Sequence, residues 1–573
     1  MKGNVQFCNV SFTYKHRSAP SIKDVSLEVE QGDFLLLTGA TGCGKSTLLK
    51  MLNGLIPHDS GGKLAGEILV GGRSTRTLGI AEMSRTVGMV FQNPDDQIFS
   101  TTVFDEVAFV LENMGLKQEQ VEPQVQEALR LVGLLDRAGA SVHALSGGQK
   151  QRLAVAAVLA AKPQVLALDE PISQLDPQGS AELLAVLKDL NVNMGITIII
   201  VEHRLHEVLP LCHKVAIMEA GKLIWQGVRE KAYSRQEIFA ANGLRLPQSV
   251  AICHQLGVTA CSDKVSDAVA AIRKCYDVPK YTPVTELAAA GLRGQQPAEL
   301  PAIRAQHLTF YYDNPEHVIL KEVELVVPPG QFIALMGSNG AGKSTLLHLI
   351  GGLLKPIAGD IKVLGKQVAG VTPSVGMVLQ NPDFMLFNST VREEIGFSLR
   401  QQQGNAPGWT EYCQQLVDKL GLNDLEEDFP LALSRGQRLR VAIAAVLVGQ
   451  PQVLLLDEPT TGQDIGHIED IVLVLKEYTR QGGSIIFCTH DTEVAARFAD
   501  RIVVMRQGRI VADDIPTAIF QDQDMLKATG LKPPAALCLS QALYGGTALT
   551  VEEVVEYVRQ TCMGGYTRAD SAS

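Results

Sequence analysis

Long apolar segments are absent from this sequence of 573 residues, in which no apolar run approaches the ~20 residues needed to span a bilayer. The N-terminal stretch MKGNVQFCNV also lacks the basic and apolar regions of a signal peptide. We therefore expect any role of this chain at a membrane to come through a partner protein.

Closely paired cysteines of the CxxC type are absent as well, although the chain has ten cysteines. Zinc and iron–sulfur sites usually need such spacing, so neither kind of site is expected. Free thiols in a reducing cytosol are the simplest account of these residues.

An excess of basic residues is also missing. The 51 Lys and Arg residues stand against 62 Asp and Glu residues, which gives a formal charge of −11. This acidic balance gives no support to a broad nucleic-acid-binding surface. We therefore expect no nucleic acid among the partners.

The sequence does contain an internal repeat, in which motifs of the first half return in the second half. The stretch GATGCGKST from Gly39 returns as GSNGAGKST from Gly337, and LSGGQ from Leu145 returns as LSRGQ from Leu433. VGMVFQNPD and VLALDEP in the first half likewise return as VGMVLQNPD and VLLLDEP. Because the chain is too long for one core, this repeat predicts two similar domains.

The repeat continues into a small appendage at the end of each half, since NGLRLPQSVAICHQLG resembles TGLKPPAALCLSQALYG. Between the halves, a stretch with four prolines and two glycines is typical of a linker. The predicted organisation is a first domain at 1–240, its appendage at 241–275, a proline-rich linker at 276–301, a second domain at 302–527, and a second appendage with a tail at 528–573.

Both glycine-rich stretches fit the pattern GxxxxGK[ST], between an apolar strand and a helical pattern. Small residues there let backbone N–H groups surround phosphate oxygens at a helix N-terminus. Lys45 and Lys343 would reach the β- and γ-phosphates, and the serine after each lysine would offer a hydroxyl to Mg²⁺. The predicted binding residues are Gly39, Thr41, Gly42, Cys43, Gly44, Lys45, Ser46 and Thr47 in the first half, and Gly337, Asn339, Gly340, Ala341, Gly342, Lys343, Ser344 and Thr345 in the second.

An acidic pair follows an apolar strand in each half. Ligands of parallel sheets bind at the carboxyl ends of the strands, where these pairs are expected to lie. Asp169 and Asp457 fit the metal side of a site, and Glu170 and Glu458 fit polarisation of an attacking water. An isolated acidic pair is more often a solvated turn or a helix cap, but the matched phosphate loops favour the functional interpretation.

A histidine also ends an apolar strand in each half, His203 in IIIVEHR and His490 in IIFCTHD. A single histidine at such a position is more often structural. Its recurrence in both halves, 34 and 33 residues after the aspartate (203 − 169 and 490 − 457), favours a contact with the γ-phosphate.

Together with LSGGQ, these motifs closely resemble those of ABC-type ATPases, and the resemblance covers both halves almost from end to end. It implies an α/β fold with two P-loop NTPase nucleotide-binding domains in tandem, each with an α-helical subdomain and a small C-terminal appendage. Such domains bind ATP and Mg²⁺ and hydrolyse ATP. In that family the domains face head to tail, so that the LSGGQ stretch of one closes over the ATP on the other.

The resemblance therefore builds each site from both halves. One site would combine Lys45, Gln92, Asp169, Glu170 and His203 with Ser434, Gly436 and Gln437. The other would combine Lys343, Gln380, Asp457, Glu458 and His490 with Ser146, Gly147, Gly148 and Gln149. Gln92 and Gln380 would act both in catalysis and as Mg²⁺ ligands. Tyr14 and Tyr312 match the aromatic residue that stacks on adenine, although an isolated tyrosine at a strand end more often packs in a core.

Two departures from the family pattern lie in the second half. Arg435 replaces the first glycine of LSGGQ, and Gln463 replaces a leucine, in TGQD where the first half keeps SQLD. If residue 435 needs a positive φ, arginine would cost roughly 1 to 2 kcal/mol there. Because the rest of the pentapeptide remains, we expect two unequal sites of which one is tuned rather than inactive.

The segments that begin at Gln92 and Gln380 resemble those of one subfamily of ABC-type ATPases. QNPDDQIFSTTVFDEVAF and QNPDFMLFNSTVREEIGF are similar to segments in the ATPases of energy-coupling-factor (ECF) importers and their cobalt and nickel relatives. Those ATPases bind an integral membrane coupling protein of the T type, which works with a small membrane protein that captures a vitamin or metal ion. The acidic residues and phenylalanines of these segments have an ordinary structural alternative, since acidic residues cap helices and phenylalanines fill cores. The residues expected near that surface are Asp95, Asp96, Gln97, Phe99, Asp383, Phe384 and Phe387.

The sequence thus predicts the ATP-hydrolysing subunit of an ECF-type importer, at the cytoplasmic face of a bacterial or archaeal membrane. The ATPase of an ABC exporter is the main alternative. A ribosome-associated translation factor of the ABC-F type is less favoured, because those proteins carry a long, charged helical linker. Nothing in the sequence identifies the transported substrate.

Overall fold

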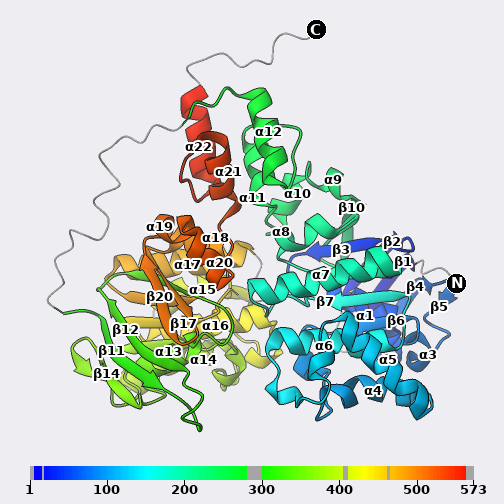
Figure 1. Ribbon diagram of the computed structural model, residues 1–573, viewed down its shortest axis with the longest axis horizontal. Coiled ribbons are helices and arrows are strands. Elements are labelled where there is room, and N and C mark those ends of the chain that lie inside the picture. The colour runs from blue at the N-terminus through cyan, green and yellow to red at the C-terminus, as the bar shows by residue number, and fades with distance from the viewer. Residues whose placement is uncertain (1–4, 16–18, 281–299, 404–410, 461–464, 563–573) are drawn as a thin grey trace. The chain divides into compact units, whose positions relative to one another are not determined.

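The computed structural model describes residues 5–15, 19–280, 300–403, 411–460 and 465–562 (Figure 1). Its internal contacts divide the chain into two units, residues 1–250 and 251–573, and each is described here by itself. Most of the proline-rich linker lies outside the described residues, as does Gln463. The division of the chain into five segments therefore stays a prediction.

The first unit contains two sheets. Their strands are β1 (Val5–Thr13), β2 (Ile22–Val29), β3 (Phe34–Gly39), β4 (Lys63–Val70), β5 (Arg73–Ser74), β6 (Val87–Val90), β7 (Val165–Asp169), β8 (Thr197–Val201), β9 (Lys214–Glu219) and β10 (Lys222–Val228). Six form a sheet of order β10-β9-β3-β8-β7-β6, parallel except for β10. The other four form an antiparallel sheet of order β2-β1-β4-β5.

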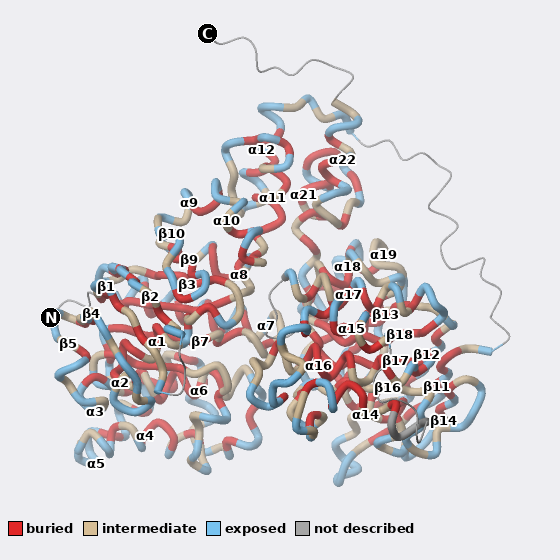
Figure 2. Tube along the Cα trace, turned by 180° about the vertical axis from the view of Figure 1, so that it is seen from behind, coloured by how far each residue is buried: buried red, intermediate tan, exposed pale blue. Residues whose placement is uncertain are grey.

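The central strands of the larger sheet show why the chain folds in this way. The segments FLLLTG, VLALD and TIIIV, which form β3, β7 and β8, bury every residue. In Figure 2 the interior of this unit, around the label β7, has the colour of buried residues. Continuous apolar runs are typical of parallel strands that are covered on both faces. The acidic pair Asp169 and Glu170, which begins with the last residue of VLALD, consequently stands at the carboxyl edge of the sheet, beside the loop that follows β3.

The helices of the first unit join these strands. They are α1 (Lys45–Leu52), α2 (Leu55–His58), α3 (Ile80–Met83), α4 (Val103–Asn113), α5 (Gln118–Leu131), α6 (Gly147–Ala160), α7 (Pro177–Met194), α8 (Leu205–Val208), α9 (Arg229–Ala232) and α10 (Gln236–Ala241), and α11 (Gln248–Gln255) crosses the unit boundary. Helices α4, α5 and α6 pack on one another and form the helical subdomain expected from the sequence.

The second unit repeats both sheets. Its strands are β11 (Ile303–Phe310), β12 (Leu320–Val327), β13 (Phe332–Met336), β14 (Ala358–Val363), β15 (Lys366–Gln367), β16 (Val375–Val378), β17 (Val453–Asp457), β18 (Ser484–Cys488), β19 (Arg501–Arg506) and β20 (Arg509–Asp514). The larger sheet has the order β16-β17-β18-β13-β19-β20 and the smaller has the order β12-β11-β14-β15. Each order matches that of the first unit, strand for strand.

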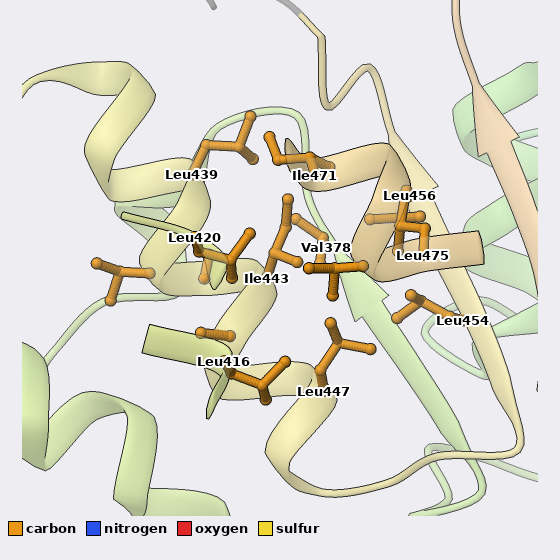
Figure 3. Packing of buried hydrophobic residues seen from close by; sticks show 14 of the residues in the cluster. Val378, Leu416, Leu420, Leu439, Ile443, Leu447, Leu454, Leu456, Ile471 and Leu475 are labelled. Atoms are coloured by element: carbon orange, nitrogen blue, oxygen red, sulfur yellow. The ribbon is translucent and has the colours of Figure 1, made fainter. Parts of the chain in front are cut away.

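The helices of the second unit resemble those of the first, but α12 precedes its first strand and, in the described residues, α2 and α3 have no counterparts. They are α12 (Val265–Cys275), α13 (Lys343–Ile350), α14 (Val391–Gln403), α15 (Glu411–Lys419), α16 (Arg435–Val448), α17 (Ile465–Arg480), α18 (Thr492–Phe498), α19 (Pro516–Gln521), α20 (Gln523–Thr529), α21 (Ala535–Tyr544) and α22 (Val551–Cys562). One apolar cluster joins α15, α16 and α17 to β16 and β17 (Figure 3). The helix that begins at Arg435 is therefore anchored on the same core as the strand that delivers Asp457.

The two predicted appendages share a core within the second unit. Apolar residues of α12 pack with those of α21 and α22, together with Ile252, Cys253 and Leu256. The guanidinium of Arg273 on α12 donates to the backbone carbonyl of Ala542 on α21 (2.8 Å). The sequence repeat indicated two appendages, and the structure shows that they pack against each other.

Across the described residues, no helix combines the length and the apolar character that crossing a membrane would require.

Candidate nucleotide-hydrolysis sites

The first glycine of each phosphate loop lies so close to a neighbouring backbone carbonyl that no side chain would fit there. A Cβ atom at Gly39 would lie 2.1 Å from the carbonyl oxygen of Met218, and one at Gly337 would lie 2.2 Å from that of Met505. Real Cβ atoms do not approach a carbonyl oxygen so closely, so any side chain would displace the loop from the neighbouring strand. The glycine holds the loop at the end of the central strand in both halves.

The last glycine of each loop starts a helix. Gly44 and Gly342 have φ values of 108° and 99°, a region that favours glycine, and α1 and α13 begin at the next residue. The Nζ atom of Lys45 donates to the carbonyl oxygens of Gly39 (2.7 Å) and Ala40 (3.0 Å), and Lys343 makes the equivalent pair of bonds (2.8 and 3.2 Å). Each loop thus presents a buried ammonium group and a free helix N-terminus, which suit a phosphate group.

The two aspartates at the strand ends have the features of metal ligands. Asp169 and Asp457 are buried, and the Oδ1 atom of each has no hydrogen-bond partner. Burial raises the pKa of Asp169 to about 6, although a hydrogen bond with Ser46 opposes that shift, and burial raises the pKa of Asp457 in the same way against Ser344. A buried, unpartnered carboxylate oxygen beside a hydroxyl fits Mg²⁺, which binds oxygen ligands.

The glutamate after each aspartate is held in a strained conformation and contacts the predicted histidine. Glu170 and Glu458 have φ values of 48° and 52°, which are uncommon for residues other than glycine. Their Oε1 atoms lie 3.1 Å from Nε2 of His203 and 2.9 Å from Nε2 of His490. In the first half, Nε2 of Gln92 also donates to Oε2 of Glu170 (2.7 Å). The structure therefore gathers the three catalytic candidates of the first half.

In the second half, the glutamine candidate stands at the matching place in the fold. Gln380 is exposed, two residues after the end of β16, as Gln92 is two residues after the end of β6. Its assignment to catalysis and to Mg²⁺ stays a prediction.

The tyrosine predicted to stack on adenine lies beside the phosphate loop in both halves. The hydroxyl of Tyr14 is 3.1 Å from Oγ1 of Thr47, and that of Tyr312 is 3.3 Å from Oγ1 of Thr345. Each ring packs edge-on against the phenylalanine two residues before it, and Tyr312 is 54% exposed. The ring of Tyr312 is therefore accessible to a nucleobase, whereas Tyr14 is partly buried and packs against the core of its half. Their contact with adenine stays a prediction.

The LSGGQ and LSRGQ stretches form helix N-termini of the same design. Ser146 caps α6 and Ser434 caps α16, and each shares a reciprocal pair of hydrogen bonds with the glutamine three residues later. Arg435 is the first residue of α16 and does not have a positive φ. The possible strain of 1 to 2 kcal/mol at this position does not arise, since residues at a helix start have ordinary backbone angles.

We expect the Arg435→Gly variant to keep the fold and to change the rate of ATP hydrolysis by less than about tenfold, or ~1.4 kcal/mol in the barrier. The reason is that the arginine replaces a glycine without backbone strain and the cap of α16 stays intact. Turnover at saturating ATP and thermal unfolding would test this. Gly147→Arg serves as the folding control, because a Cβ at Gly147 meets no atom within 4 Å. Complete loss of activity in Arg435→Gly would show instead that the guanidinium stabilises phosphate charge.

Sequence reasoning missed a buried glutamate that holds the segment after each glutamine. Oε2 of Glu106 accepts hydrogen bonds from the backbone N–H groups of Phe99 (3.1 Å) and Ser100 (2.9 Å). Oε2 of Glu394 accepts the same two bonds, from Phe387 and the following residue (both 2.8 Å). Both glutamates are only 3% exposed. The sequence contains a glutamate as the fourth residue of both VFDEVAF and VREEIGF, and this recurrence could have drawn attention to it. The helical pattern of these segments does not indicate which backbone groups the glutamate contacts.

Exposed aromatic side chains lie on these clamped segments. Phe99 is 63% exposed and packs edge-on with Phe109, with ring centroids 4.4 Å apart. Phe387 is 65% exposed and packs in the same way with Phe397 at 4.8 Å, and Phe384 is 81% exposed. Large apolar side chains that cluster in solvent usually mark a binding surface. We call Phe99 and Phe109 the first aromatic cluster, and Phe384, Phe387 and Phe397 the second aromatic cluster.

The acidic residues of the same segments make contacts inside their own half. Asp95 pairs with Lys150 (2.6 Å), and Asp383 pairs with Arg438 (2.9 Å), so each segment is tied to the helix that begins at the LSGGQ or LSRGQ stretch. Gln97 directs its amide to the end of β6, where its Oε1 atom accepts from the backbone N–H of Phe91 (3.1 Å). Gln97 thus supports the loop. Asp96 accepts only a local hydrogen bond from Asn93 (3.0 Å) among its described contacts, and it remains an acidic candidate for contact with a partner.

In each half, the strand, glycine-rich loop and helix, with an acidic pair at the end of a parallel strand one further along the sheet than the immediate neighbour, define a P-loop NTPase domain of α/β class. The model of the ABC transporter family matches residues 22–173 and 320–461. The chain therefore belongs to the ABC transporter family, with two of its ATP-binding domains in tandem. This membership supports ATP binding and hydrolysis, with Mg²⁺ as the usual accompanying ion.

Two proteins of similar sequence agree with this assignment, and one solved structure is similar to part of the chain. A protein of Methanosarcina acetivorans, named as an ABC transporter ATP-binding protein, is 40% identical over 96% of this chain and 90% of its own length. One of Caldanaerobacter subterraneus with a similar name is 33% identical over 96% of this chain and 98% of its own. A solved structure of CbiO1 from Clostridium perfringens, described as part of the ABC transporter complex cbiONQ, is 31% identical. It covers 44% of this chain and all of its own, with a TM-score of 0.39.

Proposed function

We propose that this protein is the ATP-hydrolysing, energy-coupling subunit of an ABC transporter, specifically an ECF-type importer of a vitamin or a transition-metal ion. The observation that carries the proposal is the exposed aromatic cluster in each half, on a segment that begins at the catalytic glutamine candidate and is clamped by a buried glutamate. Such a surface suits a partner with apolar helices, and its position suits a partner that must sense the nucleotide.

The reaction in this proposal is the conversion of ATP and water to ADP and phosphate. Lys45 and Lys343 exchange their loop carbonyl partners for phosphate oxygens when ATP binds. Glu170 and Glu458 orient the attacking water and accept its proton, and His203 and His490 hold these carboxylates in place. The aspartates, the serines of the phosphate loops and the glutamines would hold Mg²⁺, and the ion would supply positive charge opposite the phosphates.

The two halves complete each other's sites in this proposal, as the family resemblance implies. Ser434, Gly436 and Gln437 belong to the site with Lys45, and the LSGGQ residues of the first half belong to the site with Lys343. ATP binding then draws the halves together, and hydrolysis releases them. Because both halves are in one chain, each half has a fixed partner.

The aromatic clusters are the proposed route by which this movement reaches the membrane. Asp95 and Asp383 connect their segments to α6 and α16, whose N-termini would meet nucleotide, so a shift of these helices moves the clusters as well. The proposed partners are an integral T-type coupling protein and a small membrane protein that captures the substrate. With these partners, the chain would act at the cytoplasmic face of the membrane.

We expect Phe387→Arg to weaken assembly with the membrane partner and uptake of the micronutrient, while the isolated protein keeps its basal ATP hydrolysis. A charged side chain in the second aromatic cluster would have to be desolvated on binding. Asp96→Lys should act in the same direction by reversing charge on the first segment. Copurification from membranes, uptake of labelled substrate and ATP turnover in detergent would measure the three effects.

Leu473→Arg is the matched control, because Leu473 is 62% exposed on α17, outside the aromatic clusters. It should leave assembly and uptake at the level of the unmodified protein. The importer assignment would be wrong if the protein sedimented with ribosomes. It would also be wrong if deletion of the gene spared vitamin and metal uptake and impaired export.

A further inference from the structure

Two cysteines of the first appendage lie together within the second unit. Cys253 stands in the last turn of α11 and is fully buried, and Cys261 follows in the loop between α11 and α12, where it is partly buried. Cys253 belongs to the apolar core that α12 shares with α21 and α22, and Cys261 packs against that core. One sulfur atom is therefore sealed in the core, and the other remains within reach of solvent.

The chain between these cysteines folds back on the end of α11. Gly257 has a φ of 71°, a region that favours glycine, and it turns the chain after the helix. The backbone N–H of Val258 donates to the carbonyl oxygen of Cys253 (2.8 Å), and the protonated thiol of Cys261 donates to the carbonyl oxygen of Val258 (3.2 Å). These bonds hold the sulfur of Cys261 against the end of the helix that carries Cys253.

The two thiols interact directly, and they share protons unequally. A hydrogen bond from the Cys253 thiol lowers the pKa of the Cys261 thiol to about 7, against its partial burial, and positive charge on His254 adds to the lowering. The same bond, followed by burial, raises the pKa of the Cys253 thiol. Cys261 is thus the sulfur that ionises near neutral pH, and Cys253 keeps its proton.

This arrangement suits thiol–disulfide exchange, in which a thiolate attacks a disulfide and is most effective when its pKa lies near ambient pH. The Cys261 thiolate would attack a small disulfide, form a mixed disulfide and release one thiolate. The negative charge of Cys261 is then gone, so burial and nearby Cys275 are what still oppose ionisation of Cys253. Cys253 would lose its proton, attack the Cys261 sulfur and expel the second small thiol.

We propose that Cys261 and Cys253 form a thiol-modification site that reacts with low-molecular-weight disulfides and ends as a disulfide bond between the two cysteines. Two protein thiols are oxidised, and the small disulfide is reduced to two thiols, so the exchange needs no other reactant. The bond ties the loop of residues 256–260 to the end of α11, within the core that the two appendages share. Under reducing conditions the site holds two free thiols, and it responds when disulfides accumulate.

The test treats the reduced, full-length protein with glutathione disulfide at neutral pH. The remaining thiols are alkylated and the protein is digested with trypsin, which releases residues 246–264 as one peptide with Cys253 and Cys261 as its two cysteines. This peptide should lose two hydrogen atoms and escape alkylation. The disulfide form should exceed the glutathione adduct about tenfold or more, because the resolving thiol is already in contact with the attacked sulfur.

Three variants separate the roles of the cysteines. Cys253→Ala should stop the exchange at the glutathione adduct of Cys261, and Cys261→Ser should leave Cys253 unmodified, because that thiol is buried. Cys538→Ser is the matched control, since Cys538 is partly buried on α21 of the same unit, and it should leave the disulfide unchanged. Basal ATP turnover equal to that of the unmodified protein would show that each variant is folded.

Three results with the unmodified protein would overturn the proposal. The peptide 246–264 could keep two free thiols, or glutathione could remain on Cys261 without further exchange. Alternatively, Cys261 could join Cys275, which lies in the separate tryptic peptide 275–280 and would therefore link two peptides.

Discussion

Replacing Glu458 with glutamine is expected to lower ATP hydrolysis at the Lys343 site by about 100-fold or more, the usual range for loss of a general base. The amide has the same shape as the carboxylate but cannot accept the proton of the attacking water. Glu458 is 7% exposed and lies 2.9 Å from His490, so a side chain of equal size should leave the pocket intact. Phosphate release at saturating ATP would measure the loss, and retained ATP binding would show that the variant is folded.

Glu170→Gln is the matched variant of the other half and should reduce turnover less. In the proposed pairing, the Lys343 site receives the unaltered LSGGQ and SQLD stretches, whereas the Lys45 site receives Arg435 and Gln463. The absence of backbone strain at Arg435 means that any inequality arises from side-chain chemistry at the nucleotide. Equal losses in the two variants would remove the case for unequal sites.

The second large effect concerns residues that lie in different units of the chain. Ser146→Ala and Lys343→Ala should each reduce hydrolysis strongly, and their combined effect should be far smaller than the product of the two losses, because both would damage one site. We expect a coupling free energy of about 1 kcal/mol or more from the double-mutant cycle. The cycle is measured as ATP turnover of the two single variants and the double variant.

Ser146 also caps α6, so its loss carries a stability cost of about 1 kcal/mol that must be separated from catalysis. Thr102→Ala removes a comparable cap from α4 in the same half and should show no coupling with Lys343→Ala. The head-to-tail pairing is wrong if the effects of Ser146→Ala and Lys343→Ala multiply while Ser146→Ala couples strongly with Lys45→Ala.

Much of the fold could be read from short segments. The runs DFLLLTG and QFIALMG contain β3 and β13, and the helices that follow begin at Lys45 and Lys343, as the motif requires. The tandem α/β fold predicted from the repeat is confirmed by the matching sheet orders and the family match. Such features are local, because strand burial, loop glycines and helix starts depend on residues that are adjacent in the chain.

The site was predictable only in part. The proximity of His203 and Glu170 could be expected, since both follow neighbouring parallel strands whose carboxyl ends meet at one edge. The roles of Glu106 and Glu394 could not, because a buried glutamate on a helix is recognised only when its backbone partners are known. The ion pair of Asp95 with Lys150 could not be predicted either, for the same reason: it joins residues that are far apart in the chain. Asp95 had been a candidate for partner contact.

The sequence by itself thus determined the class of the protein and its two-domain design, and it named the residues that we expect to meet phosphate. Motif spacing is sufficient for these, because each motif folds as one strand, loop and helix. Tertiary structure alone decided that Arg435 is unstrained, since the backbone angle depends on where α16 begins. It also decided that the two appendages share one core. The contacts of this core join residues far apart in the chain, and local patterns carry no record of which distant groups come within hydrogen-bonding or packing distance.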